Sequence, residues 1–319
     1  MTTLITIHTE PQTITVSEWT LPEIPDTWAG STEFVAAAGA AARTMPPALH
    51  DGLVAFADAA PHAGAVVFRG LPVGGLPATP ASPTATVDKC RTSEFVLLAA
   101  ARRLAQPVGY EPEHGGDLVQ NLVPVRATAN RQVSTSSRVD LMFHTEAAFH
   151  PHRPRYLLLL CLRGDETAVT TLASIRELMP LLSESTVEVL FQPRFRTAVD
   201  ESYLGGRSNV LGPLVPVLSG RRSEPSMVFD ADLMVGVDGE ADEALRALGN
   251  AIERRHTGVA LRAGDLLVVD NDVAVHGRTA YSPRFDGTDR WLQRTMAVSD
   301  LAPSASERRG RIITTRFGA

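Results

Sequence analysis

The sequence predicts a mainly β protein with helices, built as a sandwich or barrel. Two observations favour this class. A helical region at about 31–105 comes first, and from Gly109 onward many short apolar runs alternate with turn residues, as in packed or closed sheets. Hydrophobic residues make up 44% of the chain, which is ample for a large core. Because all-β barrels with insertions often reach such a length as one domain, we expect a single domain over 1–319.

The N-terminal region is expected to be largely helical. Residues 31–62 predict two helices, broken at Pro46–Pro47 because a proline interrupts the helix that precedes it. A strand follows at 62–73, and then a link rich in Pro, Thr and Ser at 74–87. The last element of the region, 91–105, has the apolar spacing of an amphipathic helix.

The core, at about 106–302, is expected to hold most of the strands. Its apolar runs are short and are bounded by turn residues, which is typical of strands. The predicted strands are LVQNLVPV (118–125), RYLLLLCL (155–162), AVTTLAS (168–174), PLVPVLS (213–219), SMVFDAD (226–232), LLVVD (266–270) and RTMAV (294–298). Helices are predicted between them at 176–193 and 240–255.

One short motif predicts chemistry. The apolar residues Leu141–Phe143 lead into His144 and Glu146, a His-x-carboxylate pair. In a strand, residues i and i+2 point to the same face, so both side chains can converge on one metal ion. With a second imidazole they would form the facial triad of non-heme Fe(II) oxygenases. Taken alone, such a pair more often occurs by chance or has a structural role.

The C-terminal part of the chain contains residues that could complete a metal site with His144 and Glu146. A buried strand is predicted at Leu266–Val269, and the strand after it carries His276. Arg290 and Arg294 follow on a further strand, where their spacing places both on one face. A guanidinium inside a dry site needs a planar anion, because an unpaired buried charge is costly. Singly, these residues could be a core histidine and surface arginines; together with the His-x-Glu pair they predict a metal and anion site.

These motifs also carry a family resemblance. FHTEAAFHPHRPRYLLLLCLR, TTLAS, LFQPRF, GDLLVVDN, AVHGR and PRFDGTDRWLQR occur in family-like order and spacing. From about Val66 to Arg309 the chain resembles the clavaminate-synthase-like branch of the Fe(II)/2-oxoglutarate dioxygenases, and most of all its free-amino-acid Cβ-hydroxylases. The resemblance implies a double-stranded β-helix, or jelly roll, for the core.

The resemblance also implies the cofactors and their residues. Fe(II) would be held by His144, Glu146 and His276, and the distal carboxylate of the cosubstrate 2-oxoglutarate by Arg290 and Thr171. O2 would be the second cosubstrate. Relatives that halogenate have lost the metal-binding carboxylate. Since Glu146 is retained, hydroxylation is expected and halogenation is not.

The implied substrate is a free cationic amino acid, L-arginine or a guanidino analogue. The residues matched to substrate contacts are Arg294 and Ser134 for the α-carboxylate, Asp230 and Asp232 for the guanidinium, Asp200 and Ser202 in a closing segment, and Glu113. The two aspartates at i and i+2 of a predicted strand would repel each other unless a cation lay between them. The alternatives are asparagine, lysine, or a clavaminate-synthase-type cyclisation or desaturation.

Composition excludes several partners. A net charge of -6 without a basic cluster argues against nucleic acid or an anionic membrane. The apolar stretch at Leu157–Leu162 is too short to span a bilayer, and no secretion leader is evident. Two cysteines, Cys90 and Cys161, are too few for a disulfide framework, so we expect a cytoplasmic protein. A non-catalytic cupin-like binding protein and a zinc hydrolase stay open as other classes, and the oligomeric state is not predicted.

Overall fold

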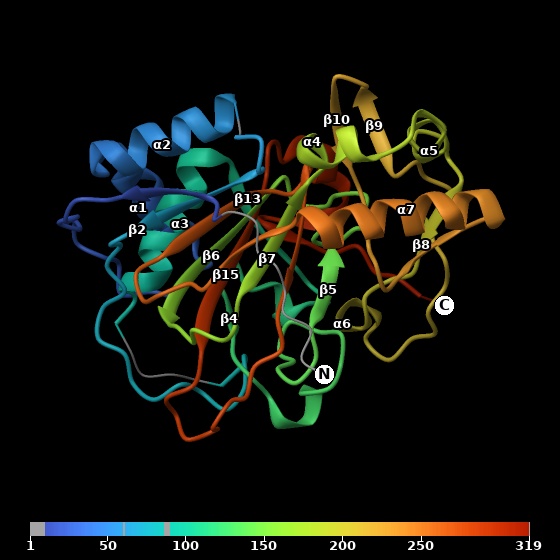
Figure 1. Cartoon of the computed structure of the whole chain (residues 1–319). Coiled ribbons are helices and arrows are strands. Elements are labelled where there is room, and N and C mark those ends of the chain that lie inside the picture. The colour runs from blue at the N-terminus through green and yellow to red at the C-terminus, as the bar shows by residue number, and fades with distance from the viewer. Residues whose placement is uncertain (1–9, 60, 86–89, 319) are drawn as a thin grey trace.

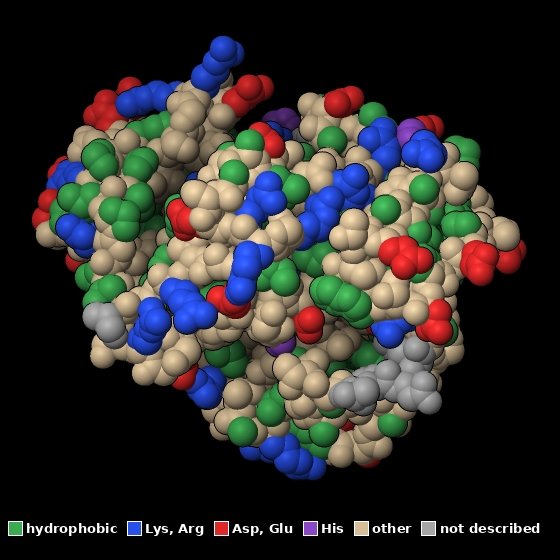
Figure 2. Space-filling view, turned by 180° about the vertical axis from the view of Figure 1, so that it is seen from behind, with side chains coloured by type: hydrophobic (Ala, Val, Ile, Leu, Met, Phe, Trp, Pro, Cys, Tyr) green, Lys and Arg blue, Asp and Glu red, His purple; other side chains and the backbone are tan. Residues whose placement is uncertain are grey.

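The computed structural model describes residues 10–59, 61–85 and 90–318. A larger and a smaller β-sheet lie face to face, and helices cover their outer sides (Figure 1). This confirms the expected class, a jelly-roll core with a helical region near the N-terminus. Figure 2 shows that acidic and basic side chains occur together on one face of the molecule. None of the helices within the described ranges has the length and apolar character needed to cross a bilayer.

Within the described residues, the strands form two main sheets and two separate two-stranded pairs. The larger sheet has the order β1 (Gln12–Thr15), β2 (Ala65–Arg69), β13 (Leu266–Asp270), β6 (Tyr156–Arg163), β15 (Trp291–Val298), β3 (Gln106–Tyr110), β17 (Ile312–Ile313) and β16 (Arg308–Arg309), with β4 (Gln120–Leu122) also paired to β15. The smaller sheet has the order β12 (Thr257–Val259), β7 (Thr170–Ser174), β14 (Ala274–Arg278) and β5 (Leu141–His144). One pair is the hairpin of β9 (Leu218–Arg221) with β10 (Glu224–Met227). The other joins β8 (Phe195–Thr197) to β11 (Met234–Gly236), with the hairpin between them in the sequence.

Helices lie on both outer sides of this sandwich. The α-helices are α1 (Thr32–Ala41), α2 (Pro47–Asp58), α3 (Thr92–Leu104), α4 (Ile175–Leu178), α5 (Glu184–Leu190), α6 (Glu201–Leu204) and α7 (Gly239–Arg255). Short 3-10 turns lie at Ala42–Thr44, His114–Gly116, Arg126–Thr128, Met179–Leu181 and Ala302–Glu307. In Figure 1, α1–α3 cover the larger sheet and α7 lies along the smaller one.

Strand β6 shows how the sequence builds the sandwich. Leu158 and Leu160 pack into the cluster that contains α1–α3, whereas Leu157, Leu159 and Cys161 point into the space between the sheets. Successive side chains of a strand face opposite sides. A strand that is buried on both faces therefore appears in the sequence as a continuous apolar run, as RYLLLLCL does.

Strand β14 alternates in the same way and places polar groups inside. Ala274 packs into the cluster between the sheets, and Val275 packs outward against Leu248 of α7. His276 and Arg278 share the inner face with Ala274, because each is an even number of residues from it. One end of the inter-sheet space is therefore polar, and this end is the candidate site.

The long helices agree closely with the prediction. Pro47 is the first residue of α2, so the break falls where the two prolines lie. Helix α7 begins after Asp238, whose carboxylate accepts a hydrogen bond from the backbone of Ala241. The helix predicted at 176–193 is divided into α4 and α5, because Ser183 caps a new helix N-terminus.

Two predicted strands are partly wrong. In PLVPVLS, regular strand begins only at Leu218, and in SMVFDAD it ends at Met227. One carboxylate oxygen of Asp230 accepts hydrogen bonds from the backbone N–H groups of Asp232 and Leu233, at 2.9 and 2.8 Å, which turns the chain. Asp230 and Asp232 are therefore not neighbours on one strand face, as the sequence had suggested.

The remaining predicted segments differ mainly in length. The strand predicted at 118–125 is shortened to β4, and the one at 62–73 to β2. The link at 74–87 contains neither helix nor strand over 74–85, while 86 and 87 lie outside the described residues.

Candidate active site

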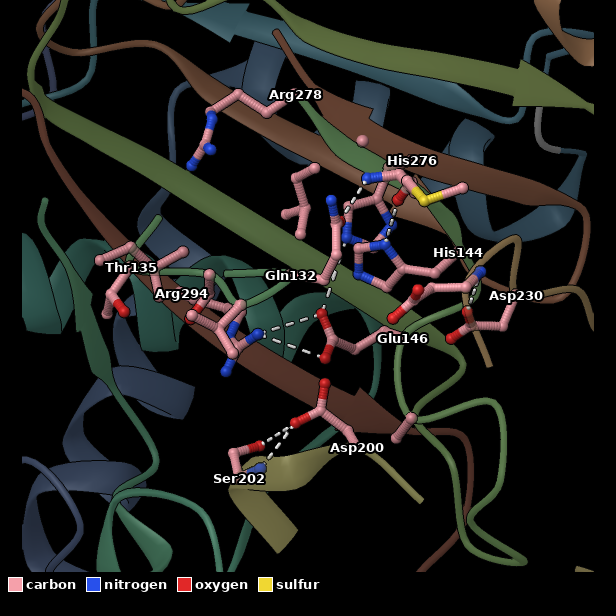
Figure 3. Close-up of a pocket in the computed structure, with 18 of the residues that line it drawn as sticks. Gln132, Thr135, His144, Glu146, Asp200, Ser202, Asp230, His276, Arg278 and Arg294 are labelled. Carbon is pink, nitrogen blue, oxygen red and sulfur yellow. Dashed lines mark hydrogen bonds and ion pairs between the residues drawn. The ribbon is translucent and has the colours of Figure 1, made fainter. Parts of the chain in front are cut away.

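A cavity of about 380 Å³ opens between the two sheets at their polar end. Its walls come from the inner faces of β5, β7, β14 and β15, from the segment 128–135 and from residues 200–203 at the start of α6 (Figure 3). It contains eleven of the twelve site residues predicted from the sequence, the exception being Thr171.

Three metal-ligand side chains meet in this cavity. His144 and His276 are directly paired across β5 and β14, and their ring centroids are 4.3 Å apart. Glu146 lies two residues beyond His144, and its Oε2 atom is 3.7 Å from Nε2 of His276. One ligand atom from each of the three residues lies within 4.8 Å of the others. Strand β5 ends at His144, so Glu146 is placed by the turn after the strand rather than by the strand itself.

A buried asparagine fixes that turn. The side chain of Asn271 accepts a hydrogen bond from the backbone N–H of Glu146 at 2.8 Å and donates to its carbonyl at 3.1 Å. On the other side, the Thr145 N–H donates to the Phe229 carbonyl at 2.7 Å. These bonds replace the strand ladder and hold the carboxylate toward the two imidazoles.

The chemistry of these donors fits a divalent transition metal. Nδ1 of His144 lies 2.9 Å from the Met142 carbonyl, which can only accept, so Nδ1 carries the proton and Nε2 has a free lone pair. Burial, reinforced by His144 and Arg294, holds the pKa of His276 well below its ordinary value, so this imidazole is neutral. Two imidazoles and a carboxylate are the donor set of a facial triad.

Arg294 lies behind the triad and is paired within the protein. Its guanidinium donates to both oxygens of Glu146 at 3.2 and 3.1 Å, as Figure 3 shows, and to Gln120 from Nε at 2.9 Å. It also donates to Glu113. Burial alone would lower the pKa of Arg294, but the carboxylates of Glu113 and Glu146 raise it above its ordinary value.

Glu113 is the second carboxylate of this buried network. It is 5% exposed and accepts a hydrogen bond from the Tyr203 hydroxyl at 2.9 Å. Burial raises the pKa of Glu113, but the charges of Arg294 and His114 and the hydrogen bonds from Arg294 and Tyr203 together lower it below its ordinary value. Burial raises the pKa of Glu146, against the attraction of Arg294. The order Glu146, Arg294, Glu113 places charges of alternating sign along one wall.

Arg290 has a different environment. It is 6% exposed and lines the cavity, yet it makes no hydrogen bond or ion pair with any residue in the described part of the chain. Its guanidinium lies 5.9 Å from the ring centroid of Tyr281. Arg278, on the inner face of β14, lies 5.1 Å from the same ring centroid, and burial together with Arg290 lowers its pKa to about 10. An unpaired buried guanidinium is a site for an anion.

The threonine in this part of the cavity is Thr170 rather than the predicted Thr171. Thr170 is paired with Arg278 and faces inward, and its buried hydroxyl has no hydrogen-bond partner among the described residues. Thr171 is paired with Gly277 and points to the opposite face of β7. The predicted Thr171 therefore lies on the outer face and its neighbour Thr170 on the inner one, because a shift of one residue along a strand reverses the direction of the side chain.

The residues predicted to bind substrate surround the cavity. Asp230 is buried and Asp232 is exposed, and neither forms an ion pair with an arginine or lysine within the described ranges. Ser134 lies on the opposite loop. Asp200 accepts hydrogen bonds from the N–H and hydroxyl of Ser202 at 2.8 and 2.6 Å and so begins α6 (Figure 3).

Several residues that shape the site were not predicted from the sequence. Arg278 could have been found, because it lies two residues after His276 and so shares its strand face. Gln120, Tyr203 and Asn271 had no such indication, since each acts on a partner far away in the sequence.

Comparisons with known proteins agree with this geometry. The family model described as "Taurine catabolism dioxygenase TauD, TfdA family" matches residues 34–296. The chain is 42% identical to L-asparagine oxygenase of Streptomyces coelicolor over 281 residues, which cover 86% of this chain and 83% of the relative. It is 38% identical to L-lysine 3-hydroxylase of Catenulispora acidiphila over 296 residues, covering 89% and 82%.

Solved structures give the same picture. Asparagine oxygenase in complex with Fe(II), 2S,3S-3-hydroxyasparagine and succinate superimposes with a TM-score of 0.88 at 37% identity, covering 95% of this chain and 99% of that one. The non-heme iron oxygenase OrfP in complex with Fe and alpha-ketoglutaric acid gives a TM-score of 0.81 at 32% identity, covering 90% and 92%. OrfP has also been solved with Fe, succinate and (3S)-hydroxy-L-Arg.

Proposed function

This chain belongs to the TauD/TfdA family of dioxygenases, and we propose that it hydroxylates an unactivated carbon, most simply Cβ, of a free cationic amino acid. L-Arginine or a guanidino analogue is the proposed substrate. The enzyme is an Fe(II)- and 2-oxoglutarate-dependent dioxygenase. One observation carries the proposal: a His-Glu-His triad shares its cavity with the unpaired guanidinium of Arg290.

The triad residues are the proposed iron ligands. When bound, Fe(II) with 2-oxoglutarate and O2 would supply the oxidising chemistry that no side chain can provide. The protein's part is to hold His144, Glu146 and His276 on one side of the ion and to keep water out. Glu146 would give one oxygen to the metal and keep the other for Arg294, which frees a donor of Arg294 toward the cavity.

Arg290 is the proposed partner of the distal carboxylate of 2-oxoglutarate. Its planar fork can donate two parallel hydrogen bonds to a carboxylate. The buried hydroxyl of Thr170 faces the same space and would supply a third. Arg278 adds a second positive charge nearby, which favours an anion at this end of the cavity.

The alternating charges of Arg294 and Glu113 suit an α-amino acid. A zwitterion presents a carboxylate, which Arg294 can bind, and an ammonium group, which Glu113 can bind. Ser134 also lines the cavity, and its hydroxyl is the proposed second donor to the same carboxylate.

The side chain of the substrate is proposed to reach Asp230 and Asp232. Asp230 uses one oxygen to cap the turn and leaves the other without a protein donor from the described side chains. A buried carboxylate of this kind is stabilised by a ligand that brings donors or positive charge. Asp200 and Ser202, on the facing segment, would close over the bound substrate.

Asparagine is the second candidate, and the 42% identical asparagine oxygenase favours it. A panel of free amino acids, scored by added oxygen mass and by succinate formed from 2-oxoglutarate, would decide between them. Arginine turnover with poor asparagine turnover supports the proposal. Turnover of asparagine alone would overturn the substrate while leaving the reaction class. Absence of any amino-acid-dependent succinate would favour a binding protein or hydrolase.

The domain organisation is also proposed. The family model spans residues 34–296 and so includes both the helical region and the sheet core. We therefore propose that the chain acts as one dioxygenase domain on a small-molecule substrate.

A further inference from the structure

The segment that closes one side of the cavity is connected to the substrate-binding arginine. Tyr203 lies in α6, and its hydroxyl donates to Glu113 at 2.9 Å. Glu113 in turn accepts from Arg294, which donates to Glu146. The four side chains form one chain of hydrogen bonds, and each residue is at most 6% exposed.

Packing fixes the ring of Tyr203 independently of its hydroxyl. Its ring centroid lies 4.9 Å from that of Phe149 and 5.8 Å from that of Tyr110, both in edge-on arrangements. The ring of His150 lies at 6.3 Å. The aromatic cluster holds the ring, so a phenylalanine in its place would keep the packing and lose only the bond to Glu113.

The carboxylate of Glu113 can accept further hydrogen bonds from a ligand. A carboxylate offers about four lone-pair positions across its two oxygens. In the structure Oε1 accepts from Arg294 and Oε2 accepts from Tyr203, so each oxygen keeps a position for a further donor. Glu113 also lines the cavity, where an ammonium group can reach it.

We propose that Tyr203 is a positioning residue, which orients Glu113 toward the ammonium group of the amino acid substrate. The inference rests on the proposed function, because it needs an amino acid in the cavity. Tyr203 shares α6 with Glu201 and Ser202, which also line the cavity. Binding of the ammonium group to Glu113 would therefore stabilise α6, through Tyr203, in the position that it has in the structure.

The test is Tyr203→Phe, with Tyr110→Phe as the matched control. Tyr110 is fully buried in the same aromatic cluster, but its hydroxyl donates to the carbonyl of His152 at 2.7 Å and not to Glu113. A hydrogen bond to a charged group is lost in the first variant only, so its KM for the amino acid should rise about tenfold or more. Its KM for 2-oxoglutarate should stay within about twofold, because Arg290 and Thr170 are untouched.

A second measurement follows α6 directly. In the wild type and in Tyr110→Phe, the amino acid should slow hydrogen exchange of the amides at 201–204, and this protection should be weaker in Tyr203→Phe. An unchanged KM in Tyr203→Phe, or an equal rise in Tyr110→Phe, would overturn the positioning role while the proposed function stood. A wild-type enzyme that turned over no free amino acid would remove the proposed function and the positioning role together.

Discussion

Replacing Arg290 with methionine tests whether this arginine binds a ligand or stabilises the fold. The change keeps a long, flexible side chain and removes the charge and all of the donors. Arg290 is 6% exposed and has no hydrogen bond or ion pair with the described residues, so the free protein loses no interaction of this kind. An unpaired buried charge is itself costly. The variant should therefore unfold at the same temperature as the wild type, or a higher one, when no ligand is present.

The cost should instead appear in the affinity for 2-oxoglutarate. Two charge-assisted hydrogen bonds to a buried carboxylate are together worth roughly 2–4 kcal/mol. At 1.4 kcal/mol per factor of ten, the KM for 2-oxoglutarate should rise by about thirtyfold to several hundredfold. Succinate formation is measured against 2-oxoglutarate concentration at saturating amino acid, together with the shift in melting temperature that 2-oxoglutarate produces.

Arg163 provides the control. It donates to the carbonyls of Gly287 and Pro77 at 3.2 Å each and to the Thr79 hydroxyl, and it does not line the cavity. Arg163→Met should lower the melting temperature and leave the KM for 2-oxoglutarate unchanged. The reasoning is refuted if Arg290→Met lowers the melting temperature as Arg163→Met does, or if its KM for 2-oxoglutarate equals that of the wild type.

Three further predictions concern the other parts of the site. His144→Ala or His276→Ala should abolish turnover and weaken Fe(II) or Mn(II) binding measured by calorimetry, since two protein ligands remain; near-normal activity would contradict the metal assignment. Thr170→Val should raise the KM for 2-oxoglutarate by about fivefold or more, because one hydrogen bond to a charged group is lost, whereas Thr171→Val should leave this KM unchanged. A larger rise in Thr171→Val than in Thr170→Val would instead support Thr171 as the residue that binds 2-oxoglutarate. Asp230→Asn should keep the turn but lower kcat/KM for arginine by about tenfold or more. The slow turnover of 2-oxoglutarate without an amino acid should be unchanged. A kcat/KM for arginine equal to that of the wild type would mean that the guanidinium binds elsewhere.

The sequence was sufficient for the parts of the fold that depend on alternation. β6 and β13 are continuous apolar runs because both of their faces are buried, and this pattern is visible without a structure. His144 and His276 were found because each follows a short apolar stretch, although Met142 in the first stretch is exposed. Where both faces of a strand are buried, however, the sequence does not show which residues face which side. All five residues of β7 are buried, so TTLAS does not indicate whether Thr170 or Thr171 faces the cavity.

The rest of the site depends on contacts that no local pattern contains. Tyr203 and Glu113 are 90 residues apart, and Glu113 and Arg294 are 181 apart. The turn at Asp230 was missed for a different reason. Its carboxylate competes with the strand ladder by binding nearby backbone N–H groups, and apolar periodicity does not report that competition.

Asp230 and Asp232 therefore differ in which substitutions the fold can tolerate at each position. Asp230 both faces the cavity and caps a turn, so a residue without a side-chain acceptor would leave the N–H groups of Asp232 and Leu233 without their partner. The side chain of Asp232 is exposed, and within the described residues it makes no hydrogen bond or ion pair that the fold requires. Position 232 can change its charge or length at little cost in stability, whereas position 230 must keep an acceptor. If Asp232 contacts the substrate as we propose, an exchange at 232 should alter substrate preference while the turn, the triad and the cosubstrate site stay as they are.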